Sequence, residues 1–152
     1  MRPQQMKLLW VDDGDDDTLA SNLAAEVQKT GLVLERASGF RDAAGRVARN
    51  GHDVCLIDCR ARSEEGLGII KSVRTAGYCA PIILLFDRAS AHLRTQADQV
   101  GVWDCLDTRQ LTAAELERSV RHALAHARMT QALRENEERL TLALRAAQEG
   151  VW

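Results

Sequence analysis

Residues 53–70 read DVCLIDCRARSEEGLGII. An apolar run, Val54–Ile57, leads directly into Asp58, and a stretch with helical spacing follows at Leu67–Ala76. A short apolar run of this kind is typical of a strand in a parallel sheet that is covered on both faces. Chemistry in such sheets lies just beyond the carboxyl ends of the strands, so Asp58 is the first candidate functional residue.

The same alternation of strand and helix extends over most of the chain. Four more β-like runs are separated by helical stretches, and Gly31, Gly51, Gly77 and Gly101 fall where a helix would stop before a strand. The other β-like runs are Met6–Val11, Leu32–Ala37, Ile82–Phe86 and Val102–Leu106, and the other helical stretches are Thr18–Thr30, Arg41–Asn50 and Ser90–Val100. This order predicts βαβ units that build one parallel sheet.

Length and composition exclude several classes of protein. The chain has 152 residues, enough for one domain with a full core, and a formal charge of −2 gives no basic surface for nucleic acid. No apolar run reaches the roughly 20 residues of a membrane span, and the N-terminus lacks the apolar core of a signal peptide. We therefore expect a cytoplasmic protein that binds neither nucleic acid directly nor a membrane.

The last stretch of the sequence differs from the rest. Thr112 and Glu115 form a capping box, and no Pro or Gly follows until after Gln148. The predicted helix exceeds the usual globular length, so we expect a domain at 1–126 and a helical linker at 127–152. A 4-then-3 spacing predicts a homodimer through this helix, the alternative being a frayed single helix. The positions are Met129, Leu133, Leu140, Ala143 and Ala147, with Asn136 taking one place in the series.

Three carboxylates are expected to meet at one edge of the sheet. The first strand leads into Asp12 and Asp13, and the third leads into Asp58. Clustered carboxylates repel one another unless a cation neutralises them, and oxygen ligands suit a hard ion such as Mg²⁺. An aspartate beside bound Mg²⁺ can act as a nucleophile toward a phosphoryl group.

These segments resemble the receiver domain of two-component response regulators from about Met6 to His126. LLWVDD (8–13) looks like the family's first strand with its acidic pair, and residues 53–70 look like its phosphoacceptor strand and loop, with Gly66 eight residues after Asp58. PIILLF (81–86) and GVWDCLDTRQLTAAEL (101–116) are similar to the last two strands and the entry to the last helix. The resemblance implies a flavodoxin-like, CheY-like doubly wound α/β fold with five parallel strands in the order 2-1-3-4-5 and an extended C-terminal helix.

The resemblance also implies roles for individual residues. Asp58 would accept a phosphoryl group from a histidine kinase or a phosphotransfer protein. Asp12, Asp13, Asp58 and the backbone carbonyl of Arg60 would hold Mg²⁺. The domain would be regulatory and not itself an enzyme. A rival hydrolase with an aspartyl-phosphate nucleophile would need a second Asp where this chain has Arg60.

Two positions depart from the family. Phe86 stands where the family has Thr or Ser, and Thr108 stands where it has Lys. Phosphoryl transfer depends on neutralising charge, so losing the Lys raises the barrier. Arg60, Arg62 or Arg88 could supply the missing charge, although none stands at the family's position. Two alternatives follow: an active phosphoacceptor, or a degenerate pseudo-receiver that serves as a phosphorylation-independent dimerisation or docking module.

The C-terminal residues 132–152 resemble a junction between a receiver domain and a PAS sensor domain. In such bacterial regulators a GGDEF-type diguanylate cyclase often comes later. That resemblance implies that the output domain lies outside this chain.

Overall fold

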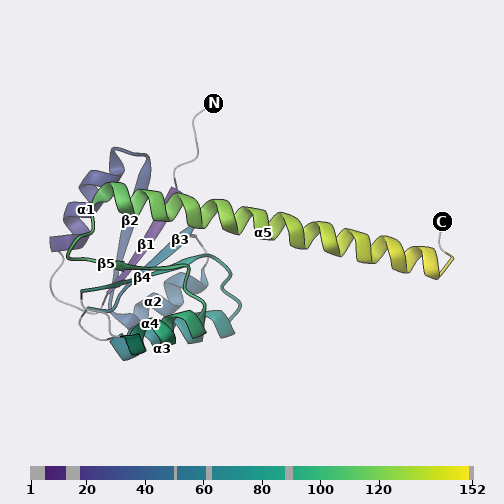
Figure 1. Ribbon diagram of the computed structural model, residues 1–152, viewed down its shortest axis with the longest axis horizontal. Coiled ribbons are helices and arrows are strands. Elements are labelled where there is room, and N and C mark those ends of the chain that lie inside the picture. Colours follow the sequence, from purple (N-terminus) through teal and green to yellow (C-terminus); the bar gives the residue numbers. More distant parts are fainter. Residues whose placement is uncertain (1–5, 13–17, 50, 61–62, 88–90, 151–152) are drawn as a thin grey trace.

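Five parallel strands form the centre of the structure, in the order β2-β1-β3-β4-β5 (Figure 1). The computed structural model describes residues 6–12, 18–49, 51–60, 63–87 and 91–150. The strands are β1 (Met6–Asp12), β2 (Leu32–Ser38), β3 (Val54–Asp58), β4 (Ile82–Phe86) and β5 (Asp104–Asp107). The helices are α1 (Thr18–Gln28), α2 (Phe40–Ala48), α3 (Ser63–Thr75), α4 (Ala91–Val100) and α5 (Ala113–Gln148). The predicted CheY-like flavodoxin fold and strand order are confirmed.

The helices cover both faces of the sheet, as Figure 1 shows. Alternate strand residues point to opposite faces, so Leu9 and Ile57 join the core beneath α2, α3 and α4. Their neighbours Trp10 and Leu56 join a second core beneath α1 and α5. Every residue of β3 and β4 is buried, because a strand covered on both faces has no side for water.

Two glycines explain where helices α3 and α4 stop. Gly77 has φ +97° and Gly101 has φ +78°, in the left-handed region that glycine adopts without steric cost. After each glycine the chain folds back: the Tyr78 N–H donates to the Val73 carbonyl at 2.9 Å, and the Val102 N–H donates to the Ala97 carbonyl at 3.3 Å. These Schellman-type ends confirm the stops that the sequence predicts there.

Helix α3 and strand β5 depart from the predicted boundaries, and the other elements agree with the prediction to within two residues at each end. Helix α3 begins at Ser63 and not at Leu67, so Glu64 and Glu65 lie in its first turn, where carboxylates favour the positive end of the helix dipole. Strand β5 is Asp104–Asp107, whereas the prediction was Val102–Leu106. The apolar pattern misled there because β5 is an edge strand, on which charged residues are tolerated.

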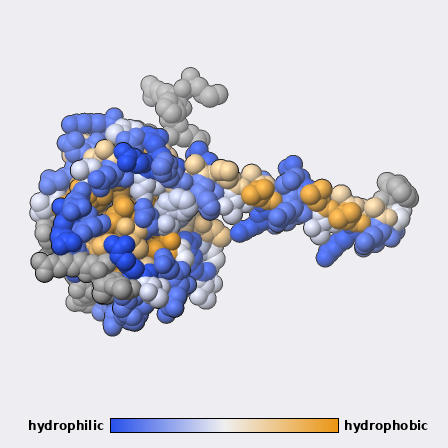
Figure 2. Space-filling model, viewed as in Figure 1, coloured by the Kyte–Doolittle hydropathy of each residue, from blue (hydrophilic) through white to orange (hydrophobic). Residues whose placement is uncertain are grey.

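Helix α5 projects beyond the domain (Figure 1). The Thr112 hydroxyl accepts a hydrogen bond from the Glu115 N–H at 3.2 Å, which confirms the predicted N-cap. The helix runs for 36 residues, about 54 Å at the usual rise. Its buried residues end at Leu124, and large apolar side chains beyond that point are exposed (Figure 2). In the described part of the chain, no helix is both long and apolar enough to cross a membrane.

Candidate functional site

The carboxyl ends of β1 and β3 bring two of the predicted aspartates together. Val11 pairs with Ile57 across these neighbouring parallel strands, and Asp12 and Asp58 are the next residue on each strand. Both are buried, with 3% and 6% of their surface exposed. Asp13, the third predicted carboxylate, lies outside the described residues.

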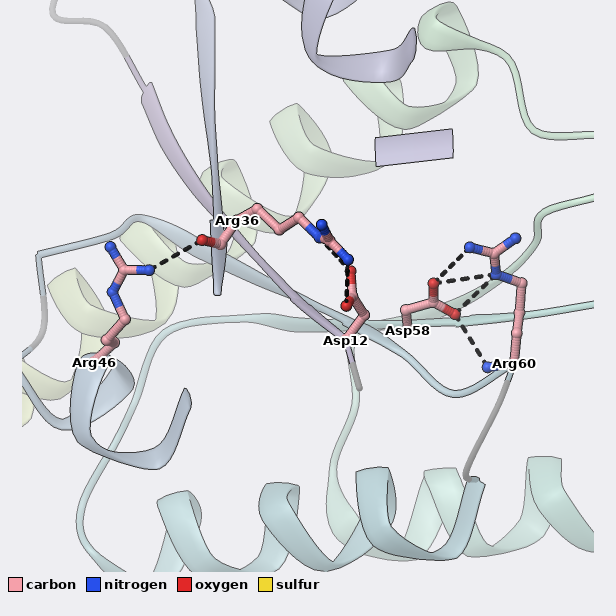
Figure 3. A network of polar contacts seen from close by, with 5 residues as sticks. All are labelled: Asp12, Arg36, Arg46, Asp58 and Arg60. Atoms are coloured by element: carbon pink, nitrogen blue, oxygen red, sulfur yellow. Dashed lines mark hydrogen bonds and ion pairs between the residues drawn. The ribbon is translucent and has the colours of Figure 1, made fainter. Parts of the chain in front are cut away.

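Asp12 is held by an arginine from the neighbouring strand β2. The Arg36 Nε donates to one Asp12 oxygen at 2.8 Å, and Nη2 donates to the other at 2.9 Å (Figure 3). This bidentate pairing is the strong form of a guanidinium–carboxylate contact. The Arg46 side chain of α2 in turn donates to the Arg36 carbonyl at 3.0 Å, which ties α2 to the same edge.

Asp58 is held by an arginine only two residues away (Figure 3). The Arg60 backbone N–H donates to Oδ1 at 3.0 Å, and the guanidinium adds Nε to Oδ1 at 3.0 Å, Nε to Oδ2 at 3.1 Å and Nη2 to Oδ2 at 2.8 Å. We call this arrangement the Asp58–Arg60 fork. The predicted role of the Arg60 carbonyl as a metal ligand stays a prediction. Its side chain, one of three arginines that the sequence offered as a source of positive charge, contacts Asp58 directly.

The oxygen ligands at this edge of the sheet suit a hard cation, but the arginines beside them do not. Two carboxylates on adjacent strands are the oxygen ligands that Mg²⁺ prefers. Among the described residues, however, no three His, Cys, Asp or Glu side chains gather closely enough to hold a metal. Arg36 and Arg60 already neutralise Asp12 and Asp58, so a cation has to compete with these guanidinium groups for the carboxylate oxygens.

Gly66 is required by packing against the loop that carries Asp58. A Cβ at this position of α3 would collide with the Cys59 Sγ and meet the Ile57 side chain at 3.4 Å. The small residue therefore lets the first turns of α3 pack against the end of β3. Burial raises the pKa of the Cys59 thiol to about 12, so this side chain stays protonated and acts as core.

The two positions that depart from the family lie at the ends of β4 and β5. Phe86 is buried, and the Arg94 guanidinium of α4 lies 5.3 Å from its ring centroid. The Thr108 backbone N–H donates to the Phe86 carbonyl at 2.7 Å, which places Thr108 at the expected end of β5. Neither residue supplies a cation.

A second fork lies directly beside Thr108. The Arg109 backbone N–H donates to Asp107 Oδ1 at 2.9 Å, and its Nε and Nη2 donate to the same carboxylate at 3.1 Å and 2.7 Å. We call this the Asp107–Arg109 fork. The Arg109 guanidinium holds the pKa of the Asp107 carboxyl below its usual value. This arginine thus faces Asp107 and does not replace the missing Lys.

Sequence reasoning found the aspartates and named Arg60 among three possible sources of positive charge, but it missed Arg36 and the direct pairing of Arg60 with Asp58. Arg36 is far from Asp12 in sequence, and only the pairing of β1 with β2 brings the two together. The two forks did carry a local signal, because Asp-x-Arg occurs at residues 58–60 and again at 107–109, each time at the end of a strand.

No protein-family profile matches the chain. The two-component response regulator PhoP of Pseudomonas aeruginosa is 28% identical over 99 residues, which cover 65% of this chain and 43% of that protein. The transcriptional regulatory protein DltR of Streptococcus agalactiae is 27% identical over 135 residues, which cover 89% of this chain and 58% of that protein. The chain thus spans about half the length of the curated relatives it matches.

Solved receiver domains share the fold. The receiver domain of an HD domain-containing protein from Pseudomonas fluorescens superposes with a TM-score of 0.73 at 17% identity, covering 87% of this chain and 96% of that one. The Vibrio cholerae chemotaxis protein CheY4 gives 0.68 at 22% identity, covering 79% and 99%. The beryllofluoride-activated NtrC4 receiver domain dimer gives 0.70 at 18% identity, covering 80% and 98%. These structures show the fold that the chain shares with them, and the sequence relatives are named as response and transcriptional regulators.

Proposed function

We propose that the chain receives a phosphoryl group on Asp58 and passes the signal through α5 to an output domain outside this sequence. The observation that carries this proposal is the position of Asp58, buried at the carboxyl end of β3 beside Asp12. The names of the sequence relatives support it, since they are response and transcriptional regulators. In this role the domain is regulatory and not an enzyme, and its partner is a histidine kinase or a phosphotransfer protein.

The proposed step is a nucleophilic displacement at phosphorus. An Asp58 carboxylate oxygen forms a bond to the phosphorus of a phosphohistidine or of acetyl phosphate, while the bond from phosphorus to the imidazole nitrogen or the acetate oxygen breaks and its electron pair leaves with that group. Asp12, Asp13, Asp58 and the Arg60 carbonyl would hold Mg²⁺, which supplies charge neutralisation when bound. Among the described residues, Asp58 would act as the nucleophile in this step and Asp12 would provide a second carboxylate beside it.

The pseudo-receiver is the second candidate function, and the residues at positions 86 and 108 favour it. A buried Phe86 has no hydroxyl to grip a phosphoryl oxygen, and Thr108 has no positive charge to attract one. A switch of this kind needs an element with two arrangements that the modification can bias. Among the described residues at the end of β4, neither Phe86 nor Asp87 carries such a hydroxyl, so a docking module that never becomes phosphorylated is a specific rival.

Intact mass separates these two functions. The protein is incubated with acetyl phosphate and Mg²⁺, with Asp58→Asn as the matched control. A gain of one phosphoryl mass in the wild type that is absent in Asp58→Asn supports the phosphoacceptor. We expect Phe86→Thr with Thr108→Lys to increase the modified fraction, because it returns a donor and a positive charge. If neither the wild type nor the variant with Phe86→Thr and Thr108→Lys gains a phosphoryl mass, the pseudo-receiver is the function.

We also propose that α5 makes the chain a homodimer. Met129, Leu133 and Leu140 are all more than half exposed on the part of α5 that projects beyond the domain, and an isolated helix of that length is poorly stabilised in water. A truncation after His126 should be monomeric in light scattering and still folded. A monomeric full chain at high micromolar concentration would contradict the dimer.

The same boundary underlies the proposed domain organisation. Burial along α5 ends at Leu124, which supports a receiver domain over 1–126 and a linker over 127–152. A PAS domain and a GGDEF-type output beyond this linker stay predictions, as does a cytoplasmic location.

A further inference from the structure

Both oxygens of the Asp58 carboxylate are contacted by a single residue. An ionised carboxylate offers about four acceptor positions on its two oxygens. Three N–H donors of Arg60 approach them: the backbone N–H donates to Oδ1, Nη2 donates to Oδ2, and the single Nε–H is shared between the two oxygens. A cation that binds Asp58 directly therefore competes with Arg60 for these oxygens.

The balance of charge at this edge of the sheet also disfavours a bound cation. Within the described residues Asp12 and Asp58 carry two negative charges, and Arg36 and Arg60 carry two positive charges in direct contact with them. Repulsion between carboxylates, which ordinarily favours a divalent ion, is thus already relieved. A divalent cation added to this arrangement would also repel two guanidinium groups a few ångströms away.

The Arg60 guanidinium can move away from Asp58 without a change in β3. Its side chain is 26% exposed, whereas the Asp58 side chain is only 6% exposed. The Arg36 side chain is exposed to the same degree, 27%, and its guanidinium holds Asp12. Rotation of the Arg60 side chain toward water therefore uncovers the Asp58 oxygens, while the Arg60 backbone N–H still donates to Oδ1.

We propose that Arg60 is the built-in counter-ion of Asp58, and that it competes with a divalent cation for the same carboxylate oxygens. The inference deepens the proposed function, because it makes Arg60 the residue that decides whether the phosphoacceptor carboxylate meets a metal. Arg60 acts on Asp58 and on no reacting atom, so it is a positioning residue. Removing its guanidinium should strengthen divalent-cation binding, whereas removing an ordinary ligand would weaken it.

Titration calorimetry with Mn²⁺ on the full chain tests this competition. Mn²⁺ takes the same oxygen ligands as Mg²⁺. In Arg60→Met, which keeps a flexible apolar stem, we expect Mn²⁺ to bind on the order of tenfold more tightly than in the wild type, because one nearby positive charge is gone. Arg109→Met is the matched control, since it removes a guanidinium from the other fork and should bind Mn²⁺ as the wild type does.

A double variant locates the effect at Asp58. The tighter binding should disappear in Arg60→Met combined with Asp58→Asn. Binding in Arg60→Met that is equal to or weaker than that of the wild type would overturn the proposal, as would a gain that persists without Asp58.

A second test uses the wild-type protein alone, so it does not depend on whether a variant folds. The Arg60 Nε–H signal in ¹⁵N-resolved NMR should shift as Mg²⁺ is added, because the fork opens when the carboxylate is taken. An unchanged Arg60 signal at saturating Mg²⁺ would overturn the competition. Neither measurement uses a phosphodonor, so its outcome is independent of the mass assay that tests whether Asp58 accepts a phosphoryl group.

Discussion

The Asp58–Arg60 fork and the Asp107–Arg109 fork are the same local structure in two environments. In both, an aspartate at the end of a strand accepts from the backbone N–H and the guanidinium of the arginine two residues later. The aspartate side chain is 6% exposed in the first fork and 25% exposed in the second, and the arginines are 26% and 55% exposed. The Asp-x-Arg sequence therefore sets the geometry of the ion pair. The position of the strand in the sheet sets how much that ion pair contributes to the stability of the fold.

The difference in exposure follows from the order of the strands. β3 lies in the middle of the sheet between β1 and β4, so its end is flanked by other strand ends. β5 is an edge strand with a neighbour on one side only. Screening by water and salt makes an exposed ion pair weak, while a buried one is costly to break.

Thiol chemistry should show the largest contrast. Burial raises the pKa of Cys59, inside the first fork, from 9.0 to about 12, so the thiolate fraction falls roughly a thousandfold. We expect iodoacetamide to modify the exposed Cys79 first and Cys59 far more slowly, as followed by peptide mass spectrometry at neutral pH. Cys59 reacting as fast as Cys79 would show that the end of β3 is open to solvent.

Arginine removal should destabilise the domain unequally. Arg60→Met leaves the buried Asp58 carboxylate without its guanidinium, which costs about 2 kcal/mol of unfolding free energy. Urea unfolding should show this loss, and added Mg²⁺ should restore part of it, since a ligand that binds only the folded state stabilises that state. Arg109→Met, at the exposed fork, should unfold close to the wild type. Equal losses in the two variants would contradict the role given to burial.

Substitution of Gly66, which packs against Cys59 next to Asp58, should have a smaller effect on stability. Gly68 on the same helix provides the control. Gly66→Ala forces a methyl group toward the Cys59 Sγ and should cost about 1–2 kcal/mol. Gly68→Ala, two residues later on α3, meets no atom within 4 Å and should stabilise the helix by up to about 1 kcal/mol. Thermal unfolding measures both, and adding Cys59→Ala should rescue Gly66→Ala. A Gly66→Ala protein as stable as Gly68→Ala would contradict the packing.

The sequence predicted the sheet better than the site. Runs such as Val54–Ile57 are apolar because both faces of β3 are covered, so local pattern was enough to place Asp58 at the end of a strand. The partner of Asp12 could not be found in this way, because Arg36 reaches it only through the pairing of β1 with β2. Arg60 was one of three arginines that could supply positive charge there, and only the geometry of the loop after β3 shows that its guanidinium pairs with Asp58.

The smallest expected effect is the pH dependence of the exposed fork. The Arg109 guanidinium lowers the pKa of the Asp107 carboxyl below 3.8 in the folded protein. A group whose folded pKa is depressed stabilises the fold above its unfolded pKa, and that contribution is lost as pH falls through the lower, folded value. Because the carboxylate and its partner both face water, salt should screen the interaction, and the pKa should rise toward 3.8 at high ionic strength. Carboxyl-carbon NMR titration in low and high salt measures this shift. Arg109→Met should bring the Asp107 pKa closer to 3.8, because only the backbone N–H of residue 109 then donates to the carboxylate. An Asp107 pKa that is lowered as far in Arg109→Met as in the wild type would mean that the guanidinium does not hold this carboxylate, and the second fork would then not be the exposed counterpart of the first.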